Sequence, residues 1–214
     1  MKSGGRYDVS GLVEAQFEPG SRGRVSRNLR GIKSSRKMDE AETLALREAM
    51  DEFVSAFDES HRFTSEDICG MHRRWLHGIY AWAGAYRHVN VSKDGFPFAA
   101  AGRVPALMED YSRDVLAKLT PCRRARKEDV AAALAQSHAE LVLIHPFREG
   151  NGRIARVLAT LMALQAHLPP LDFSDITGGR RARYFAAVQA GMDRNYQPMQ
   201  ELFVRIIDRT VAAA

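Results

Sequence analysis

One stretch decides the fold of this chain: His145-Pro146-Phe147-Arg148-Glu149-Gly150-Asn151-Gly152-Arg153, with Arg156 following it. The residues at 141–144 before it form an apolar run, which is typical of the buried end of a helix. Pro146 stops helical continuation, so we expect His145 at a helix end facing a loop. The Gly-Asn-Gly break then separates this helix from a second one.

Two side chains in this stretch suit the chemistry of a nucleotide. The imidazole of His145 can accept a proton near neutral pH. Glu149 offers an oxygen ligand to a hard cation such as Mg²⁺, which usually takes its remaining ligands from phosphates and water. A base beside a magnesium carboxylate therefore predicts a nucleotide as the partner of this loop.

A turn and two arginines complete the stretch. Gly150 and Gly152 free the backbone, so that successive N–H groups can converge on an anion where the second helix begins. Arg153 and Arg156 are neighbours on one helical face, and guanidinium groups match phosphate oxygens in pairs. The pattern predicts that the arginines hold the β- and γ-phosphates. The alternative is a charged turn between two core helices.

These residues resemble the Fic family, whose motif His-x-Phe-x-Asp/Glu-Gly-Asn-Gly-Arg-x-x-Arg is filled here at every fixed position. The resemblance implies a protein adenylyltransferase, which transfers AMP from ATP to a Ser, Thr or Tyr hydroxyl of a target protein and releases pyrophosphate. It implies His145 as the base, Glu149 as the Mg²⁺ ligand and Phe147 as a buried anchor of the loop. It also implies that Asn151 and the backbone at Gly150 and Gly152 bind the α-phosphate region, and that Arg153 and Arg156 bind the outer phosphates.

Two alternatives to AMP transfer stay open. One is a Fic-fold enzyme with another output, such as removal of AMP or transfer of another nucleotide or phosphate. The other is a non-catalytic, nucleic-acid-associated module. The related Doc kinases carry Ala-Asn-Lys where this chain has Gly-Asn-Gly, which favours AMP transfer over phosphate transfer. Resemblance to toxin-like members implies a topoisomerase subunit as the first candidate target.

The rest of the sequence predicts an all-α fold: a single Fic-type helical domain at 38–214 after an extended N-terminal arm at 1–37. A chain of 214 residues with 45% hydrophobic content can bury one core. Helical periodicity predicts helices over 38–57, 64–82, 104–119, 127–144, 152–167, 180–195 and 197–211. In the first, we expect a buried face made of Leu44, Leu46, Met50, Phe53, Val54 and Phe57.

The exception to helical periodicity is the segment at 88–99. Alternation around Asp94-Gly95 predicts a small β-hairpin. The preceding Trp82-Ala83-Gly84-x-x-Arg87 resembles the stretch before the target-docking flap of Fic proteins, which implies that Val91, Lys93 and Phe96 meet the target. The alternative is a hairpin that merely covers the helix bundle.

Regulation is predicted from a shorter pattern. Many Fic proteins are held inactive by a Ser/Thr-x-x-x-Glu-Gly/Asn segment whose glutamate pairs with the second motif arginine, here Arg156. Two incomplete matches exist, Ser10 with Glu14 in the arm and Ser55 with Glu59, and neither has the final Gly or Asn. Ser10 and Glu14 are thus candidate inhibitory residues. The favoured alternative is an antitoxin-like partner that supplies the glutamate to a toxin-like enzyme.

Other residues carry weaker signals. Tyr184 and Tyr196 are candidates for the adenine and ribose pocket, with core packing as the alternative. His138 is expected to be a satisfied core residue or one that supports the site. The basic run at 123–127 is interpreted as a solvated loop, so the formal charge of +5 argues little for nucleic acid binding.

The cysteine content and the hydropathy of the sequence indicate in which compartment the protein is found. Cys69 and Cys122 lie far apart and outside any metal-ligand spacing, so we expect them to be reduced. The sequence has neither a hydrophobic signal segment nor an apolar run long enough to cross a bilayer. These features predict a soluble, cytoplasmic protein without a membrane partner.

Overall fold

Two helices, α5 (Lys127–Ile144) and α6 (Asn151–Gln165), form the centre of the fold in the computed structural model, which describes residues 11–176 and 181–213. Both helices bury side chains on most of their circumference, because α5 packs against α6 on one side and against α8 (Gln197–Ala212) on another. A helix that is apolar on most sides is expected in such a central position. The loop between α5 and α6 is the stretch that the sequence singled out.

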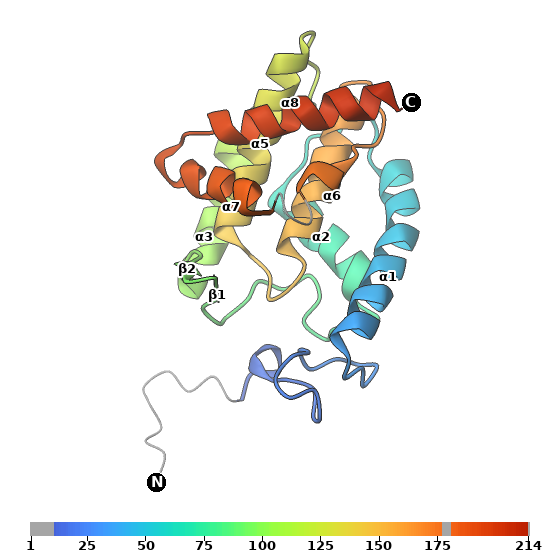
Figure 1. Cartoon of the computed structure of the whole chain (residues 1–214), viewed down its shortest axis with the longest axis vertical. Helices are drawn as coiled ribbons and strands as arrows, with labels where there is room; N and C mark the ends of the chain where they lie inside the picture. Colours follow the sequence, from blue (N-terminus) through green and yellow to red (C-terminus); the bar gives the residue numbers. More distant parts are fainter. Residues whose placement is uncertain (1–10, 177–180, 214) are drawn as a thin grey trace.

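The remaining elements surround this pair (Figure 1). They are α1 (Ser35–Ala56), α2 (Ser65–Leu76), the strands β1 (Ser92–Lys93) and β2 (Phe96–Pro97), α3 (Val104–Tyr111), a π-helical turn (Ser112–Leu116), α4 (Ala117–Leu119) and α7 (Arg181–Ala190). Short 3₁₀ turns lie at Ala101–Arg103, Phe173–Ile176 and Gly191–Asp193. The mostly helical fold predicted from the sequence is confirmed.

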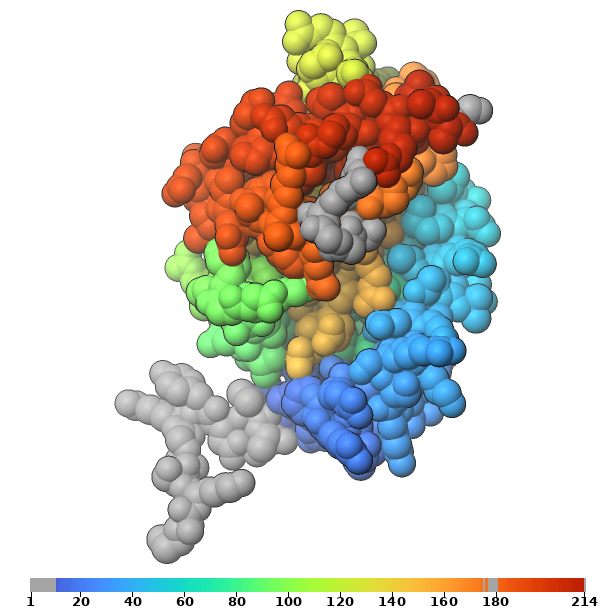
Figure 2. All heavy atoms as spheres, in the orientation of Figure 1, coloured from blue at the N-terminus to red at the C-terminus, as the bar shows by residue number. Residues whose placement is uncertain are grey.

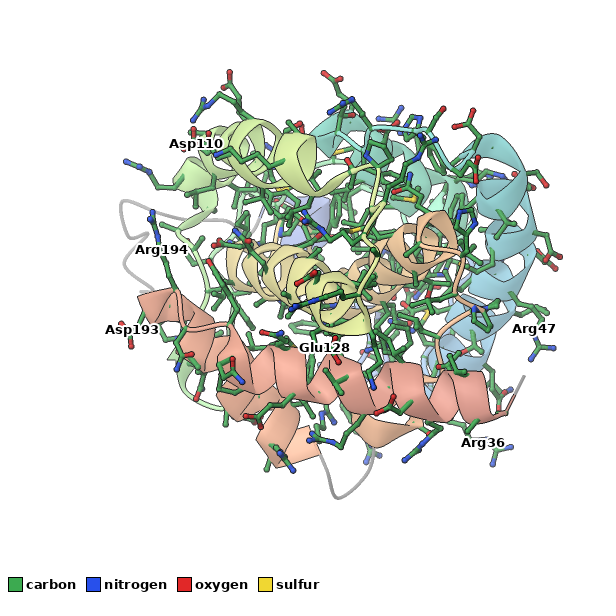
Figure 3. All side chains as sticks on the ribbon, turned by 90° about the horizontal axis from the view of Figure 1, so that it is seen from above. Arg36, Arg47, Asp110, Glu128, Asp193 and Arg194 are labelled. Carbon is green, nitrogen blue, oxygen red and sulfur yellow. The ribbon has the colours of Figure 1, made fainter. Side chains whose placement is uncertain are left out.

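Many charged side chains point away from the bundle. Figure 3 shows Arg36, Arg47, Asp110 and Arg194 extending outward from the ribbon, and all four are exposed. The basic run at 123–127 is exposed as well; residues 123–126 lie in the loop before α5, as predicted, and Lys127 begins the helix. Cys69 and Cys122 are free thiols, and Cys122 is buried. Among the residues described, no helix is long and apolar enough to cross a membrane.

Helix α1 confirms most of the predicted buried face and corrects two of its positions. Phe53 is buried, and Leu46, Met50 and Phe57 pack partly buried against the core. Leu44 and Val54 are 55% and 49% exposed, whereas the buried positions are Met38, Glu42, Ala49 and Phe53. These four follow helical spacing, so the buried stripe includes a carboxylate. Counting only apolar residues therefore included Leu44 and Val54 wrongly and missed Glu42. The consequence is that Glu42 must find partners inside the protein.

Helix α2 begins as predicted and ends earlier. Thr64 accepts a hydrogen bond from the backbone of Asp67, whose carboxylate accepts one from the backbone of Thr64, which is a complete capping box. The predicted end at residue 82 is wrong, because backbone carbonyls beyond Leu76 accept hydrogen bonds from the arm. The Arg30 side chain donates to the carbonyl of Gly78, and the backbone N–H of Leu29 donates to the carbonyl of Ile79.

The hairpin at 88–99 is confirmed. Strands β1 and β2 pair antiparallel, with Lys93 opposite Phe96. The turn residues Asp94 and Gly95 have φ values of 51° and 81°, the positive values that a tight type I′ hairpin turn requires. We call residues 88–99 the flap from here on.

The arm is folded back on itself, so the prediction of an extended segment is wrong for residues 11–34. A 3₁₀ turn at Val13–Ala15 precedes a β-bridge between Phe17 and Ser26. Arg22 and the glycines at 20 and 23 turn the chain between these bridge partners with positive φ. The arm lies beneath the helix bundle in Figure 1, at the end where the α5–α6 loop emerges.

Candidate active site

A cavity of about 540 Å³ opens where the flap, the α5–α6 loop and α7 meet. Its lining includes the predicted residues Val91, Lys93, His145, Glu149, Gly150, Asn151, Gly152, Arg153, Arg156 and Tyr184, together with Phe98, Arg181 and Phe185. In Figure 2 the yellow-orange segment around the motif reaches the surface between the green flap, orange-red α7 and the blue arm. The structure thus brings most of the predicted site residues to one cavity.

His145 caps the C-terminal end of α5 with a left-handed backbone, at φ 52°. Its Nδ1 lies 3.1 Å from the carbonyl oxygen of Val142 and must donate to it, because a carbonyl only accepts. The proton therefore sits on Nδ1, and Nε2 keeps its lone pair. Burial, with the charges of Arg87 and Lys93 adding to it, lowers the pKa of His145 to about 4. The ring is neutral at physiological pH and ready to accept a proton.

Two residues give the α5–α6 loop its shape. The Asn151 amide accepts from the backbone N–H of Phe147 and donates to its carbonyl, at 2.8 Å in both cases. Its side chain is thus engaged within the loop, so only the backbone groups of this turn remain for an anion. Gly150 has φ 82°, and a Cβ there would lie 2.8 Å from Trp75, so only glycine fits.

His72 of α2 supports this loop from behind. Its Nδ1 accepts a hydrogen bond from the backbone of Gly84, so its Nε2 carries the proton and donates to the Glu149 carbonyl at 3.1 Å. The ring stacks on Phe147, with centroids 3.8 Å apart, which confirms Phe147 as a buried anchor. Burial lowers the pKa of His72 to about 4, so this two-sided clamp is uncharged at neutral pH.

Glu149 lines the cavity, and 42% of its side chain is exposed. Oε1 accepts weak hydrogen bonds at 3.5 Å from Ser26 of the arm and from Arg148. Burial raises the pKa of this carboxyl, against the lowering effect of Arg148. A single carboxylate beside an open cavity suits Mg²⁺, because phosphate and water oxygens usually supply the other ligands of this ion. The described residues contain no group of three or more ligands that would form an all-protein metal site.

The two motif arginines lie in different surroundings. Arg153 is paired with Glu42 of α1, at 2.6 Å between Nη2 and Oε2. Arg156 has no carboxylate partner among the side chains that the structure describes. Burial lowers its pKa, and the nearby Tyr184 hydroxyl acts in the opposite direction. Arg156 therefore offers its donors to an anion in the cavity, whereas Arg153 is already held from behind.

Aromatic side chains from α7 line the other side of the cavity. The Tyr184 hydroxyl lies 2.9 Å from Nε2 of His138, which is buried in the core as predicted. Lys93 of the flap lies over the ring of Phe185, with its Nζ 4.6 Å from the centroid. Arg181 also stacks on this ring, at 5.4 Å. The Lys93 contact thus joins the flap to α7 across the cavity, whereas the Arg181 contact lies within α7.

Other predicted residues lie away from this cavity. Phe96 packs edge-on against Phe98 and lines a smaller recess between the flap and α7. Tyr196 bonds to Glu140 of α5. Ser10 lies outside the described residues. Glu14 lies at the base of the flap, where its Oε1 accepts from the backbone N–H of His88 at 2.7 Å. The structure therefore places the Glu14 carboxylate on the flap instead of on Arg156.

For several residues that hold the site, no supporting role was predicted from the sequence, although Arg87 was named in the stretch before the flap. Arg87 is almost fully buried, and it donates to the carbonyls of His145 and Val89 at 2.7 Å each, so it ties the flap to the base. Glu42 could have been found as a charge on the buried stripe of α1. The contacts of His72 with Gly84 and Glu149 join segments distant in sequence, so they could not be predicted from a local sequence pattern.

Comparison with known proteins agrees with this geometry. A sequence model described as the Fic/DOC family matches residues 62–163. The chain is similar to "Protein adenylyltransferase Fic" of Nematostella vectensis, 29% identical over 82% of this chain and 40% of that protein. It is also similar to "Protein adenylyltransferase VbhT" of Bartonella schoenbuchensis, 27% identical over 66% of this chain and 29% of that protein.

Solved structures show the same fold. The N-terminal Fic domain of a Bartonella effector protein from Bartonella sp. AR 15-3 superposes with a TM-score of 0.73, at 20% identity, over 95% of each chain. The chain spans less than half the length of the curated relatives described above. The matched segment contains α2, the flap and the motif loop with most of α6. Residues 62–163 therefore form a domain of the Fic/DOC family.

Proposed function

We propose that this chain is a protein adenylyltransferase that transfers AMP from ATP to a Ser, Thr or Tyr hydroxyl of a target protein. The observation that carries the proposal is the neutral His145 ring, with Nε2 free to accept a proton, in one cavity with Glu149 and Arg156. The names of the relatives, protein adenylyltransferases from animals and from Bartonella, support the same reaction.

The proposed step balances as a nucleotidyl transfer. Nε2 of His145 takes the proton of the target hydroxyl, and the oxygen bonds to the α-phosphorus of ATP while the bond to pyrophosphate breaks. Arg153 and Arg156 stabilise the charge of the departing pyrophosphate. Glu149 would hold Mg²⁺, which neutralises charge on the triphosphate. The backbone at Gly150–Gly152, where α6 begins, faces the α-phosphate, and Tyr184 of α7 lines the adenosine side.

The partner predictions belong to this proposal. The flap edge carrying Val91 and Lys93 would receive the target segment beside His145. Arg156, with no paired carboxylate in the described part of the chain, would accept a glutamate from an antitoxin-like inhibitor. A topoisomerase subunit stays the first candidate target. Restraint by such a glutamate is the toxin-like part of the proposal.

The test uses ATP labelled at either the α- or the γ-phosphate. The purified chain is incubated with Mg²⁺ and a bacterial lysate, and His145→Ala serves as the control. Protein label from the α-phosphate only, lost in the variant, supports AMP transfer with His145 as base. Label from the γ-phosphate would reveal a kinase, and α-label retained at the wild-type rate in His145→Ala would overturn the base assignment.

A further inference from the structure

Glu42 is a charged residue buried in the middle of α1, with 3% of its surface exposed. Three contacts surround it. The Tyr80 hydroxyl donates to its Oε1 at 2.8 Å, the Trp75 indole N–H donates to its backbone carbonyl at 2.8 Å, and Arg153 pairs with its Oε2 at 2.6 Å. A buried carboxylate is costly unless paired, so these partners hold Glu42 in one position.

Arg153 is held on two sides as a result. One edge of the guanidinium meets Glu42, and its plane lies over the Trp75 ring, 4.9 Å from the centroid. Trp75 also packs against Gly150, where the loop turns. The fork of an arginine has five N–H donors, and the Glu42 contact engages only the edge that faces α1.

The rest of the Arg153 side chain faces the cavity. It lines the cavity and keeps 25% of its surface exposed, whereas the Glu42 side chain keeps 4%. A carboxylate that competed with the nucleotide phosphates for the donors of Arg153 would have to lie inside the cavity. Glu42 instead lies behind Arg153, on the side of the core. Glu42 therefore supports Arg153 from the side of the core, and Arg153 presents its remaining donors to the cavity.

We propose that Glu42 is a positioning residue for ATP binding: it fixes the guanidinium of Arg153 so that its free donors meet the outer phosphates of the nucleotide. The inference rests on the proposed function, in which Arg153 binds the triphosphate. Glu42 itself touches no substrate. A long arginine loses rotamer entropy when it binds, and Glu42 and Trp75 remove that loss before the nucleotide arrives.

The test compares a nucleotide with outer phosphates to one without them. Calorimetric titrations of Mg²⁺–AMPPNP and of AMP are made with the wild-type chain and with Glu42→Gln. We expect Glu42→Gln to weaken AMPPNP binding about tenfold, the worth of one charge-assisted hydrogen bond, and to leave AMP binding unchanged. Tyr80→Phe, which removes only the donor to Oε1, should give a smaller loss in the same direction.

The controls separate positioning from folding. Glu40→Gln alters an exposed carboxylate of the same helix, which pairs with Arg36, and should change neither affinity. In an Arg153→Ala background, Glu42→Gln should have no further effect on AMPPNP binding. Unchanged or tighter AMPPNP binding by Glu42→Gln would overturn the inference. If the wild-type chain binds AMPPNP no more tightly than AMP, the phosphate site of the proposed function fails instead.

Discussion

The ring of Phe98 stacks on the ring of His145, with centroids 3.6 Å apart and planes inclined by 14°. Phe98 belongs to the end of the flap, and His145 caps α5, so the contact joins the flap to the proposed base. With Nδ1 of His145 bonded to Val142, the stack fixes the plane in which the Nε2 lone pair points. The flap therefore helps to orient the base.

Removing this ring should slow the chemical step. For Phe98→Ala we expect the rate of labelling from α-labelled ATP to fall about tenfold at saturating ATP, a part of what an oriented general base contributes. Nucleotide affinity should change much less. Phe98→Tyr keeps the stacked ring and should label at close to the wild-type rate. Equal rates for the Ala and Tyr variants would show that the stack does not orient His145.

The loop glycines provide a matched pair of stability predictions. Gly150→Ala should destabilise the fold by about 2–4 kcal/mol, because alanine is strained at φ 82° and its Cβ would lie 2.8 Å from Trp75. Gly152→Ala places its Cβ no closer than 3.8 Å to Arg156, inside a helix, and should be neutral or slightly stabilising. Denaturant unfolding of both variants makes the comparison. Similar losses in the two would contradict the assigned strain.

The sequence predicted local features well and long-range contacts poorly. Helix α5 has the predicted bounds, and the capping box of α2 and the Asp94-Gly95 turn are present, because each depends on neighbouring residues. The α1 face was predicted only in part, because tertiary packing there exposes Leu44 and buries Glu42. The early end of α2 depends on Leu29 and Arg30, which no pattern within α2 reveals.

The candidate site shows the same division. The motif brings His145, Glu149 and Arg156 to the cavity because they lie on one loop and the first turns of one helix. The residues that hold the loop, His72 and Glu42, come from other helices, and their sequence surroundings resemble ordinary core. Site residues were thus predictable where spacing alone fixes them.

Labelling should persist in acid longer than an unperturbed histidine would allow. The pKa of His145 is lowered from 6.5 to about 4, mainly by burial, so the ring stays unprotonated and able to accept a proton down to about pH 5. The pH profile of the labelling rate at saturating ATP should therefore show no decrease near pH 6.5 from this group. A decrease of the labelling rate with a midpoint between pH 6 and 7 and the slope of one titrating group would contradict the low pKa.

The free energy of unfolding should decrease as the pH falls from 6.5 toward 4. His72 and His138 have pKa values lowered by burial to about 4 and about 3, so between these values and 6.5 the unfolded chain binds protons that the folded chain does not. Each histidine contributes a slope of roughly 1.4 kcal/mol per pH unit in that window. Denaturant unfolding at a series of pH values measures it. A flat profile from pH 6.5 to 5 would show that neither ring is neutral and buried.

The arm offers a test between support and self-inhibition. Because the Glu14 carboxylate accepts from the His88 backbone and its own carbonyl accepts from Arg148 at 2.9 Å, Glu14 joins the arm to the flap and the motif loop. Glu14→Ala should therefore lower the α-label rate several-fold, about the worth of one lost hydrogen bond, by loosening the base of the flap. Glu18→Gln, which alters a carboxylate bonded within the arm to Asn28, should have a smaller effect. A higher rate for Glu14→Ala would instead reveal a brake, as the Ser10–Glu14 pattern predicts, and would require the arm to reach Arg156 in a second arrangement.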